Sequence, residues 1–460
     1  MGATVPLRAW SQDCAIAEMP RTLVNVMLQG GADLRFLFMP APGHPDPVYT
    51  GLIWQARRVL YDSEYPDYET LFENEYLPAQ DNRTGLQFGI HRDAEWLWRQ
   101  FGEGRVAVVC NAYCSRNRRH DQSILNADAG EPELEVLNFD RNGWGGRLVE
   151  YLGPHVNSVE LGDSVSTFNK GSVPGARLDQ VVHAEDMRDM ALAAGSVENP
   201  ASARSVLARA LSSWYDVRSQ ETRSEQPADW PWHAFYRHYE SLRDFGGRVE
   251  ERLSQCQPLA ESLQSMQLAS SGFAQQCRNL YDLCQVPDVL QVGAVSMNYG
   301  GWDTHDGEAG EIRRNLSDLF ASSGGLATTT AAIEELPYRD VSPASQLVFY
   351  FASDFGRQLV ANGTAGTDHG RGTYSVLIGQ QVRGGVYGEM FPQREAAPDA
   401  DGRIPLQTPG ADIEGQTSTD RLLATAADWV SPGAGAVVFP AASGSGLEPG
   451  VDVGTLLADA

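Results

Sequence analysis

Three short clusters of acidic and histidine residues lie within one stretch of this chain, residues 298–371. They are Asp303 with His305 in NYGGWDTHDGE, Asp354 in LVFYFASDFGR, and Asp368 with His369 in NGTAGTDHGRG. Carboxylates and imidazoles that converge from separate loops are suitable ligands for Zn²⁺ or another divalent ion. One such cluster alone is equally typical of a loop cap or a surface salt bridge. Three clusters in succession favour a metal site.

The segments before these clusters predict the strands that position them. Residues 289–297 and 346–352 are short, apolar and rich in Val and aromatic residues, which is typical of buried strands. Residues 23–29 predict the first core strand, and two glycines follow it, so the backbone can turn sharply there. Asp33 comes next, either as a turn residue that binds its own backbone or as a ligand. Open α/β sheets place their sites beyond such strand ends.

A fourth predicted strand, residues 106–111, leads into a basic segment, AYCSRNRRHDQS. The guanidinium groups in this segment suit a phosphate or sulfate clamp, and equally suit ion pairs with nearby acids. Backbone N–H groups at a helix N-terminus in this segment would favour a bound anion. The candidates are Ser115, Arg119 and His120 for catalysis, with Arg116, Arg118 and Arg357 for anion binding.

The motifs GGWDTH, SDFGR, GTDHGRG and VRGGVYGEM occur in this order, after LQGGADLRFLFMP and NGWGGRLVEYL. Together they resemble a large bacterial family of uncharacterised, often exported proteins, labelled sulfatase-like, within the alkaline phosphatase superfamily. The resemblance covers residues 23–440. It implies an α/β fold, specifically an alkaline-phosphatase-like three-layer sandwich with a mostly parallel central sheet.

The same resemblance implies a site for one or two divalent ions, Zn²⁺ or similar. One ion would be held by Asp303, His305 and His369. The other would be held by Asp33 and Asp354, completed by a hydroxyl or by His120, and Asp368 is a further candidate ligand.

Two departures from the family pattern argue against a complete second metal site and against the usual serine nucleophile. Arg119 stands where the family has a serine, and Phe355 stands where the superfamily has a histidine. Ser115 is the best substitute nucleophile because it follows the predicted strand closely.

The chain is long enough for one large α/β domain, so we expect residues 1–460 to form a single domain. Residues 186–285 are mostly helical in pattern and predict a helical insertion. Further helices are expected at residues 94–101, 142–152, 311–320, 328–336 and 420–429, and further strands at residues 374–378 and 436–439.

Composition limits the partners. A net charge of −25 argues against nucleic-acid and anionic-membrane partners. No apolar run approaches the roughly 18 residues of a transmembrane helix, and MGATVPLRAW lacks the apolar core of a signal peptide. A periplasmic or secreted location is expected from the resemblance alone, and the sequence does not indicate the oligomeric state.

The 6 cysteines allow 15 full pairings, among which the sequence does not choose. At least one disulfide and a Cys-metal site at CNAYC are both open alternatives.

These patterns predict a metal-dependent hydrolase of phosphate or sulfate esters with a small anionic substrate. The alternative is a non-catalytic exported binding or assembly protein that keeps the scaffold and one metal.

Overall fold

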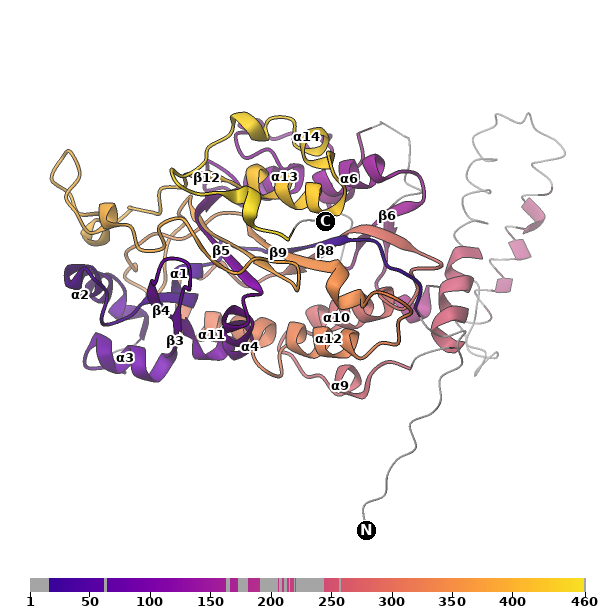
Figure 1. The fold of residues 1–460 in the computed structure, drawn as a ribbon, viewed down its shortest axis with the longest axis horizontal. Coiled ribbons are helices and arrows are strands. Elements are labelled where there is room, and N and C mark those ends of the chain that lie inside the picture. Colours follow the sequence, from indigo (N-terminus) through magenta and orange to yellow (C-terminus); the bar gives the residue numbers. More distant parts are fainter. Residues whose placement is uncertain are drawn as a thin grey trace, which may run out of the picture.

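The computed structural model describes residues 16–61, 64–162, 166–172, 181–190, 244–255 and 258–458, with a few shorter pieces between residues 206 and 220. A mostly parallel sheet lies at the centre, with helices on both of its faces (Figure 1). The mixed α/β class expected from the sequence is therefore confirmed. None of the described helices is long and apolar enough to cross a membrane.

The central sheet is assembled from strands distant in sequence. Its spatial order is β11 (Gly385–Tyr387), β5 (Val106–Tyr113), β10 (Thr373–Ile378), β9 (Leu347–Ser353), β1 (Thr22–Leu28), β8 (Gln291–Tyr299), β6 (Val156–Glu160) and β7 (Val181–His183), and β12 (Thr417–Ser418) pairs with β5. Only β10 runs antiparallel to its neighbours in this set. Every residue of β1, β5, β9 and β10 is buried. This agrees with the continuous apolar runs expected of strands covered on both faces.

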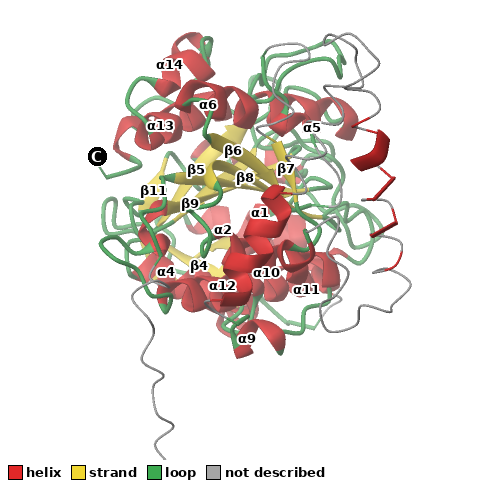
Figure 2. Cartoon of the chain, turned by 90° about the vertical axis from the view of Figure 1, so that its right-hand side faces the viewer, coloured by secondary structure: helices red, strands yellow, loops and turns green. Residues whose placement is uncertain are grey.

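Two groups of helices cover the sheet, as Figure 2 also shows. One face carries α6 (Trp144–Leu152), α13 (Thr419–Val430) and α14 (Ala434–Val438). The other carries α2 (Pro47–Arg57), α4 (Glu95–Gly102), α10 (Ser271–Leu283), α11 (Glu308–Phe320) and α12 (Gly325–Glu334). Four further α-helices are α1 (Leu34–Leu37), α3 (Tyr68–Glu75), α5 (His120–Ala129) and α9 (Glu261–Gln264), and residues 244–255 are also helical.

A second, antiparallel sheet of three strands was not predicted from the sequence. Its order is β2 (Phe38–Pro40), β4 (Gln87–His91) and β3 (Tyr76–Gln80). These strands are short, and Pro40 and Pro78 lie within them. Proline is a weak strand signal because it cannot donate to the sheet.

The predicted elements around the site are confirmed, since β1, β5, β8, β9, β10, α4, α6, α11, α12 and α13 all overlap their predicted ranges. The predicted strand at residues 436–439 is wrong. This apolar run forms α14, which packs against α6 and α13. A run of four apolar residues fits either structure, so packing decides between them. Residues 191–205 and 221–243 of the predicted helical insertion lie outside the described residues.

Candidate metal centre

The candidate site lies where five segments meet at one edge of the central sheet. Because β1, β5, β8 and β9 are parallel, their carboxyl ends share this edge, and antiparallel β10 begins there. Two loops at this edge are joined by hydrogen bonds: Glu308 N donates to Ala365 O at 2.9 Å, and Thr367 N donates to Thr304 O at 3.1 Å. Residues 57 and 63 positions apart in sequence are thereby brought together.

Asp303 is the centre of this cluster. Its Oδ1 lies 3.1 Å from His305 Nε2 and 3.0 Å from His369 Nε2, and the two imidazole nitrogens are 2.9 Å apart. Its Oδ2 lies 3.5 Å from His120 Nε2. Three imidazoles therefore direct the same ring nitrogen toward one carboxylate.

The other nitrogen of each imidazole is held by an oxygen. His120 Nδ1 lies 2.5 Å from Asp354 Oδ2, His305 Nδ1 lies 3.0 Å from Asp368 Oδ1, and His369 Nδ1 donates to the carbonyl oxygen of Arg118 at 2.9 Å. Such partners favour the tautomer with a proton on Nδ1, which leaves Nε2 free to bind a metal. The orientation of the rings is thus set from outside the cluster.

The ligand atoms of His120, Asp303 and His369 all lie within 4.8 Å of one another, so this cluster could hold a metal ion. Two neutral imidazoles with a carboxylate are a suitable donor set for a divalent ion. The buried Nε2 of His120 also has no hydrogen-bond partner among the described residues. An unsatisfied buried acceptor that faces the cluster can bind a metal cation or accept a proton.

Asp354 acts as the fixed support of His120 and is itself fully buried. Gly31 N donates to its Oδ1 at 2.5 Å, and Gly30 N donates to it at 3.2 Å. Both glycines have positive φ angles, 121° at Gly30 and 82° at Gly31. A Cβ on Gly30 would come within 2.3 Å of Asp303 N, so the close approach of these two loops requires glycine.

Arg357 supports Asp303 from the protein interior. Its buried guanidinium donates to Asp303 Oδ1 at 2.7 Å and to the carbonyl oxygens of Gly30, Gly31, Trp302 and Thr367. Burial alone would raise the pKa of Asp303, but the hydrogen bonds from His369 and Arg357 outweigh it and lower the pKa to about 2. Arg357, predicted to bind an anion, is here enclosed by the chain's own oxygens.

Asp33, expected with Asp354 as a ligand of the second ion, has partners of its own within the chain. Its buried carboxylate is paired with Arg57 and accepts a hydrogen bond from Arg35 N at 3.1 Å, as the cap of α1. The charge that a metal would neutralise is thus already met by an arginine. The chain's own Arg57, which no motif indicated, makes this difference.

Glu308 lies beside Asp33 and was also missed in the sequence. Its Oε2 accepts a hydrogen bond from Thr367 Oγ1 at 2.6 Å, and Thr367 directly precedes Asp368 in the chain. Complete burial, with the neighbouring Asp33 carboxylate, raises the pKa of Glu308 well above its usual range, whereas Arg57 holds the pKa of Asp33 below its usual range despite burial. In the sequence, the only signal that Glu308 lies near the site was its position three residues after His305.

The three arginines after β5 pair with carboxylates. Arg116 lies 3.2 Å from Glu133, Arg118 lies 2.9 Å from Asp412, and Arg119 lies 2.7 Å from Asp121. These contacts match the alternative of ion pairs with nearby acids. Anion binding by Arg116 and Arg118 stays a prediction.

The candidate Ser115 and a second serine close to His120, Ser123, both have structural partners. Ser115 is buried and its Oγ accepts a hydrogen bond from Asn117 Nδ2 at 2.9 Å, and Ser123 donates to Asn117 Oδ1 at 3.2 Å. Arg119 is the cap residue before α5, so His120 is the first residue of that helix. The ring of Phe355 packs on His120 and His369, with centroid distances of 4.7 and 4.4 Å.

Cys110, Cys114, Cys277 and Cys284 are free and buried. These four residues therefore form no disulfide with one another, and Cys14 and Cys256 lie outside the described part of the chain. The group of possible metal ligands among the described residues contains no cysteine, and the Cys-metal site at CNAYC stays an untested alternative.

The profile of the family described as "Protein of unknown function (DUF1501)" matches residues 168–400, which is just over half of the chain, and the chain belongs to this family. This match corrects the expected assignment to a sulfatase-like family of the alkaline phosphatase superfamily, because DUF1501 is a distinct family. No curated protein matches the sequence. The cluster of Asp303, His305, Asp354, Asp368 and His369 lies wholly within the matched region, and His120 lies outside it.

Proposed function

We propose that this member of the DUF1501 family binds a divalent metal ion, Zn²⁺ or similar, through Asp303, His305 and His369, and hydrolyses a small phosphate or sulfate ester. The observation that carries the proposal is the arrangement of the three imidazoles, each with Nδ1 held by an oxygen and Nε2 directed at Asp303. That arrangement is typical of histidines prepared for a metal.

The three proposed ligand atoms are 2.9–3.1 Å apart. Ligand bonds of about 2.0–2.2 Å to one tetrahedral ion imply separations only slightly larger, so a small outward movement would suffice. Three protein ligands leave the fourth position open, as in catalytic zinc sites. When bound, such an ion supplies Lewis-acid polarisation of a phosphoryl or sulfuryl oxygen.

His120 is proposed as the general base. Its Nε2 faces the cluster without a hydrogen-bond partner among the described residues. The hydrogen bond from Nδ1 to Asp354 raises the pKa of His120, against the opposing effect of burial. An imidazole oriented by a buried carboxylate can accept a proton from an attacking water molecule at Nε2.

Arg357 and Asp354 have supporting roles in this proposal. Arg357 holds the carboxylate of Asp303 in its charged form and joins it to the glycine turn after β1. Asp354 holds His120 in one tautomer. Both groups are buried, so they keep their geometry without reorganisation during the reaction.

The experiment is to measure bound metal by elemental analysis and turnover of an aryl phosphate and an aryl sulfate. His369→Ala and Asp303→Asn should lose both metal and turnover. His120→Gln should keep the metal and lose about 10²-fold or more in turnover, the scale of general base catalysis. The control is Ser123→Ala, which removes an α5 hydroxyl that donates to Asn117. It should change neither the bound metal nor the turnover.

A second candidate function is favoured by the hydrogen bonds that engage the two serine hydroxyls closest to His120 in the sequence. Ser115 and Ser123 are both engaged with Asn117, and Arg119 precedes His120. A protein that binds the metal and an anionic ligand without turning it over would have this arrangement. Metal in the wild-type protein without turnover of either ester would support this binding function and contradict the hydrolase.

For the fold we propose a three-layer arrangement like that of alkaline phosphatase. This proposal concerns the architecture and does not assign the chain to that family. Export to the periplasm or the outside of the cell stays a prediction.

A further inference from the structure

A cavity of about 490 Å³ lies on the face of the sheet that carries α6, α13 and α14. Gly130 at the end of α5, Arg147 of α6, Asp420 of α13 and Val437 of α14 line it, and Figure 2 shows these four helices. Its volume lies within the range of about 300–1,000 Å³ that small-molecule sites occupy. The ten residues of α5 separate it from His120 by about 15 Å.

The walls of this cavity are mostly apolar. They include Pro132, Leu134, Val437, Phe439 and Pro440. The loop after α5 is held in place by Asn126, whose Nδ2 donates to the carbonyl oxygens of Pro132 at 3.3 Å and Leu134 at 3.0 Å. The cavity therefore offers an apolar surface that is formed before any ligand binds.

Four charged residues line the cavity, and two of them have partners outside it. Glu131 forms an ion pair with Arg141. Glu133 lies 3.2 Å from Arg116 and accepts a hydrogen bond from Tyr113 at 2.7 Å. The charges of these two glutamates are thus already balanced by the chain.

Arg147 is the third charged residue, and it forms no ion pair with a described carboxylate. Its Nε, Nη1 and Nη2 donate to the carbonyl oxygens of Val438, Asn142 and Ala129 at 2.8, 3.1 and 2.7 Å. Burial lowers the pKa of Arg147, against the weaker effect of two glutamates. A guanidinium has five N–H donors, so two remain for an anion.

Asp420 is the fourth charged residue, and only 2% of it is exposed. Its Oδ2 accepts a hydrogen bond at 2.6 Å from Ser445 Oγ, which belongs to another lining residue. Its Oδ1 has no hydrogen-bond partner among the described residues, and no described arginine or lysine forms an ion pair with it. A buried carboxylate oxygen without a partner is costly, so it favours a donor on an occupant.

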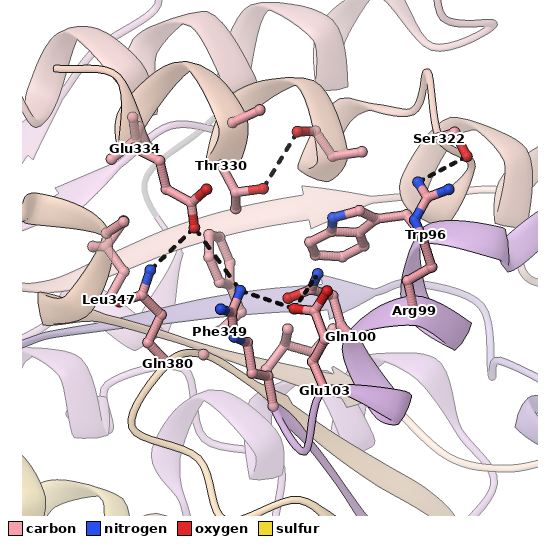
Figure 3. Close-up of a pocket in the computed structure, with 17 residues that line it drawn as sticks. Trp96, Arg99, Gln100, Glu103, Ser322, Thr330, Glu334, Leu347, Phe349 and Gln380 are labelled. Carbon is pink, nitrogen blue, oxygen red and sulfur yellow. Dashed lines mark hydrogen bonds and ion pairs between the residues drawn. The ribbon is translucent and has the colours of Figure 1, made fainter. Parts of the chain in front are cut away.

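A second cavity, of about 380 Å³ between α4 and α12, differs in its charges. There Arg105 lies 3.1 Å from Glu103 and 4.0 Å from Glu334, and Figure 3 shows contacts that link these two glutamates. Its charges satisfy one another and select no charged occupant. In the cavity beside α13, one cation and one anion are each left without an opposite charge.

We propose that the cavity beside α13 binds a zwitterionic α-amino acid with an apolar side chain. The carboxylate accepts the two unused N–H groups of Arg147, the ammonium donates to Asp420, and the side chain lies against Val437 and Phe439. An occupant with a single charge would leave one of the two protein charges unmatched. This site is independent of the metal centre and of the proposed hydrolase activity.

The probes are phenylalanine, N-acetylphenylalanine, which lacks the positive charge, and phenylalaninamide, which lacks the negative charge. Binding is measured by titration calorimetry on the full chain at pH 6, between the α-carboxyl pKa of about 3.3–3.7 and the α-amino pKa of about 7.7–8.0. We expect phenylalanine to bind at least tenfold more tightly than either derivative, a difference of about 1.4 kcal/mol. Because amino acids also coordinate metal ions, the titration is repeated with a chelator, which should leave the affinity unchanged.

One variant and its control test Asp420. Asp420→Asn keeps an acceptor for Ser445 and removes the charge, so it should weaken phenylalanine about tenfold and leave N-acetylphenylalanine unchanged. Asp140→Asn removes an exposed charge outside the cavity lining and should leave the affinity for phenylalanine unchanged. Arg147 also holds three backbone carbonyls, so its role is tested by phenylalaninamide and not by substitution.

Four results would overturn the proposal. They are equal affinity for the three probes, no binding of phenylalanine up to about 10 mM, equal effects of Asp420→Asn and Asp140→Asn, and loss of binding in the presence of the chelator.

Discussion

Asp33 and Asp303 follow neighbouring parallel strands, β1 and β8, at the same edge of the sheet, but their surroundings differ. Asp33 is buried and paired with Arg57. Asp303 is half-exposed, and although Arg357 contacts its Oδ1, its Oδ2 has only the Nε2 of His120, at 3.5 Å. Each carboxylate is paired with an arginine of the chain, but only that of Asp303 also faces three imidazole nitrogens.

Both carboxylates have an arginine partner, Arg57 for Asp33 and Arg357 for Asp303, so the difference lies in exposure: Asp33 is enclosed, whereas Asp303 is half-exposed and turns its Oδ2 toward the imidazole of His120. A buried carboxylate with its own arginine stabilises the fold and has no need of an ion. A carboxylate surrounded by oriented, unprotonated imidazole nitrogens offers a site that a divalent cation satisfies. The surrounding residues, more than the aspartate, decide which outcome occurs.

The largest expected effect comes from removing the cation beside Asp33. Arg57→Met should destabilise the protein by about 3–5 kcal/mol because it leaves a buried charge without its partner. Urea unfolding followed by circular dichroism measures the loss. The double variant Asp33→Asn with Arg57→Met should recover most of it. A loss below about 1 kcal/mol in the single variant would mean that Asp33 is neutralised by something other than Arg57.

A smaller effect on stability is expected from pH, through Glu308 beside Asp33. The pKa of Glu308 is raised in the folded state by burial and by Asp33, so the folded protein keeps a proton that the unfolded chain releases. Stability should be complete below the unfolded value of about 4.3 and fall as the pH rises toward the folded pKa, by up to about 1.4 kcal/mol per pH unit.

Glu308→Gln imitates the protonated acid and should remove this contribution. Unfolding free energies of wild type and variant at pH 5 and pH 7 are compared, with Glu311→Gln on the same helix as control. The wild type and Glu311→Gln should lose stability over this interval by about 2–3 kcal/mol more than Glu308→Gln. Parallel pH profiles for all three proteins would contradict a retained proton on Glu308.

The smallest effect is expected at the support of the imidazoles around Asp303. Asp368→Asn weakens the hydrogen bond that orients His305 and should lower metal affinity about 10–100-fold, as outer partners of metal ligands typically do. Competition with a chromophoric chelator measures the affinity. Arg119→Ala, which breaks an exposed ion pair, is the control and should shift the affinity by less than about twofold. Equal effects of the two substitutions would leave no special role for the Asp368–His305 contact.

The sequence alone determined five strands of the central sheet, β1, β5, β8, β9 and β10, and the edge where the candidate residues gather, but it did not predict β6, β7, β11 or β12. Long apolar runs such as residues 346–352 can only be buried strands or helix segments, and the flanking glycines and acids favour strands. Asp303, His305 and His369 were therefore placed together by local signals, and the structure does bring their ligand atoms within 3.1 Å. The coarse α/β class rests on the same local signals.

Only the tertiary structure decided which acids belong to the cluster. Asp33 follows its strand as Asp303 does, and the difference is made by Arg57, whose distance of 24 residues in sequence gives no signal. The family assignment also failed, because short motifs such as WDTH and TDHG describe a local geometry that distinct families can share. Charge neutralisation and hydrogen bonding depend on contacts between residues far apart in sequence, and these contacts form only when the sheet assembles.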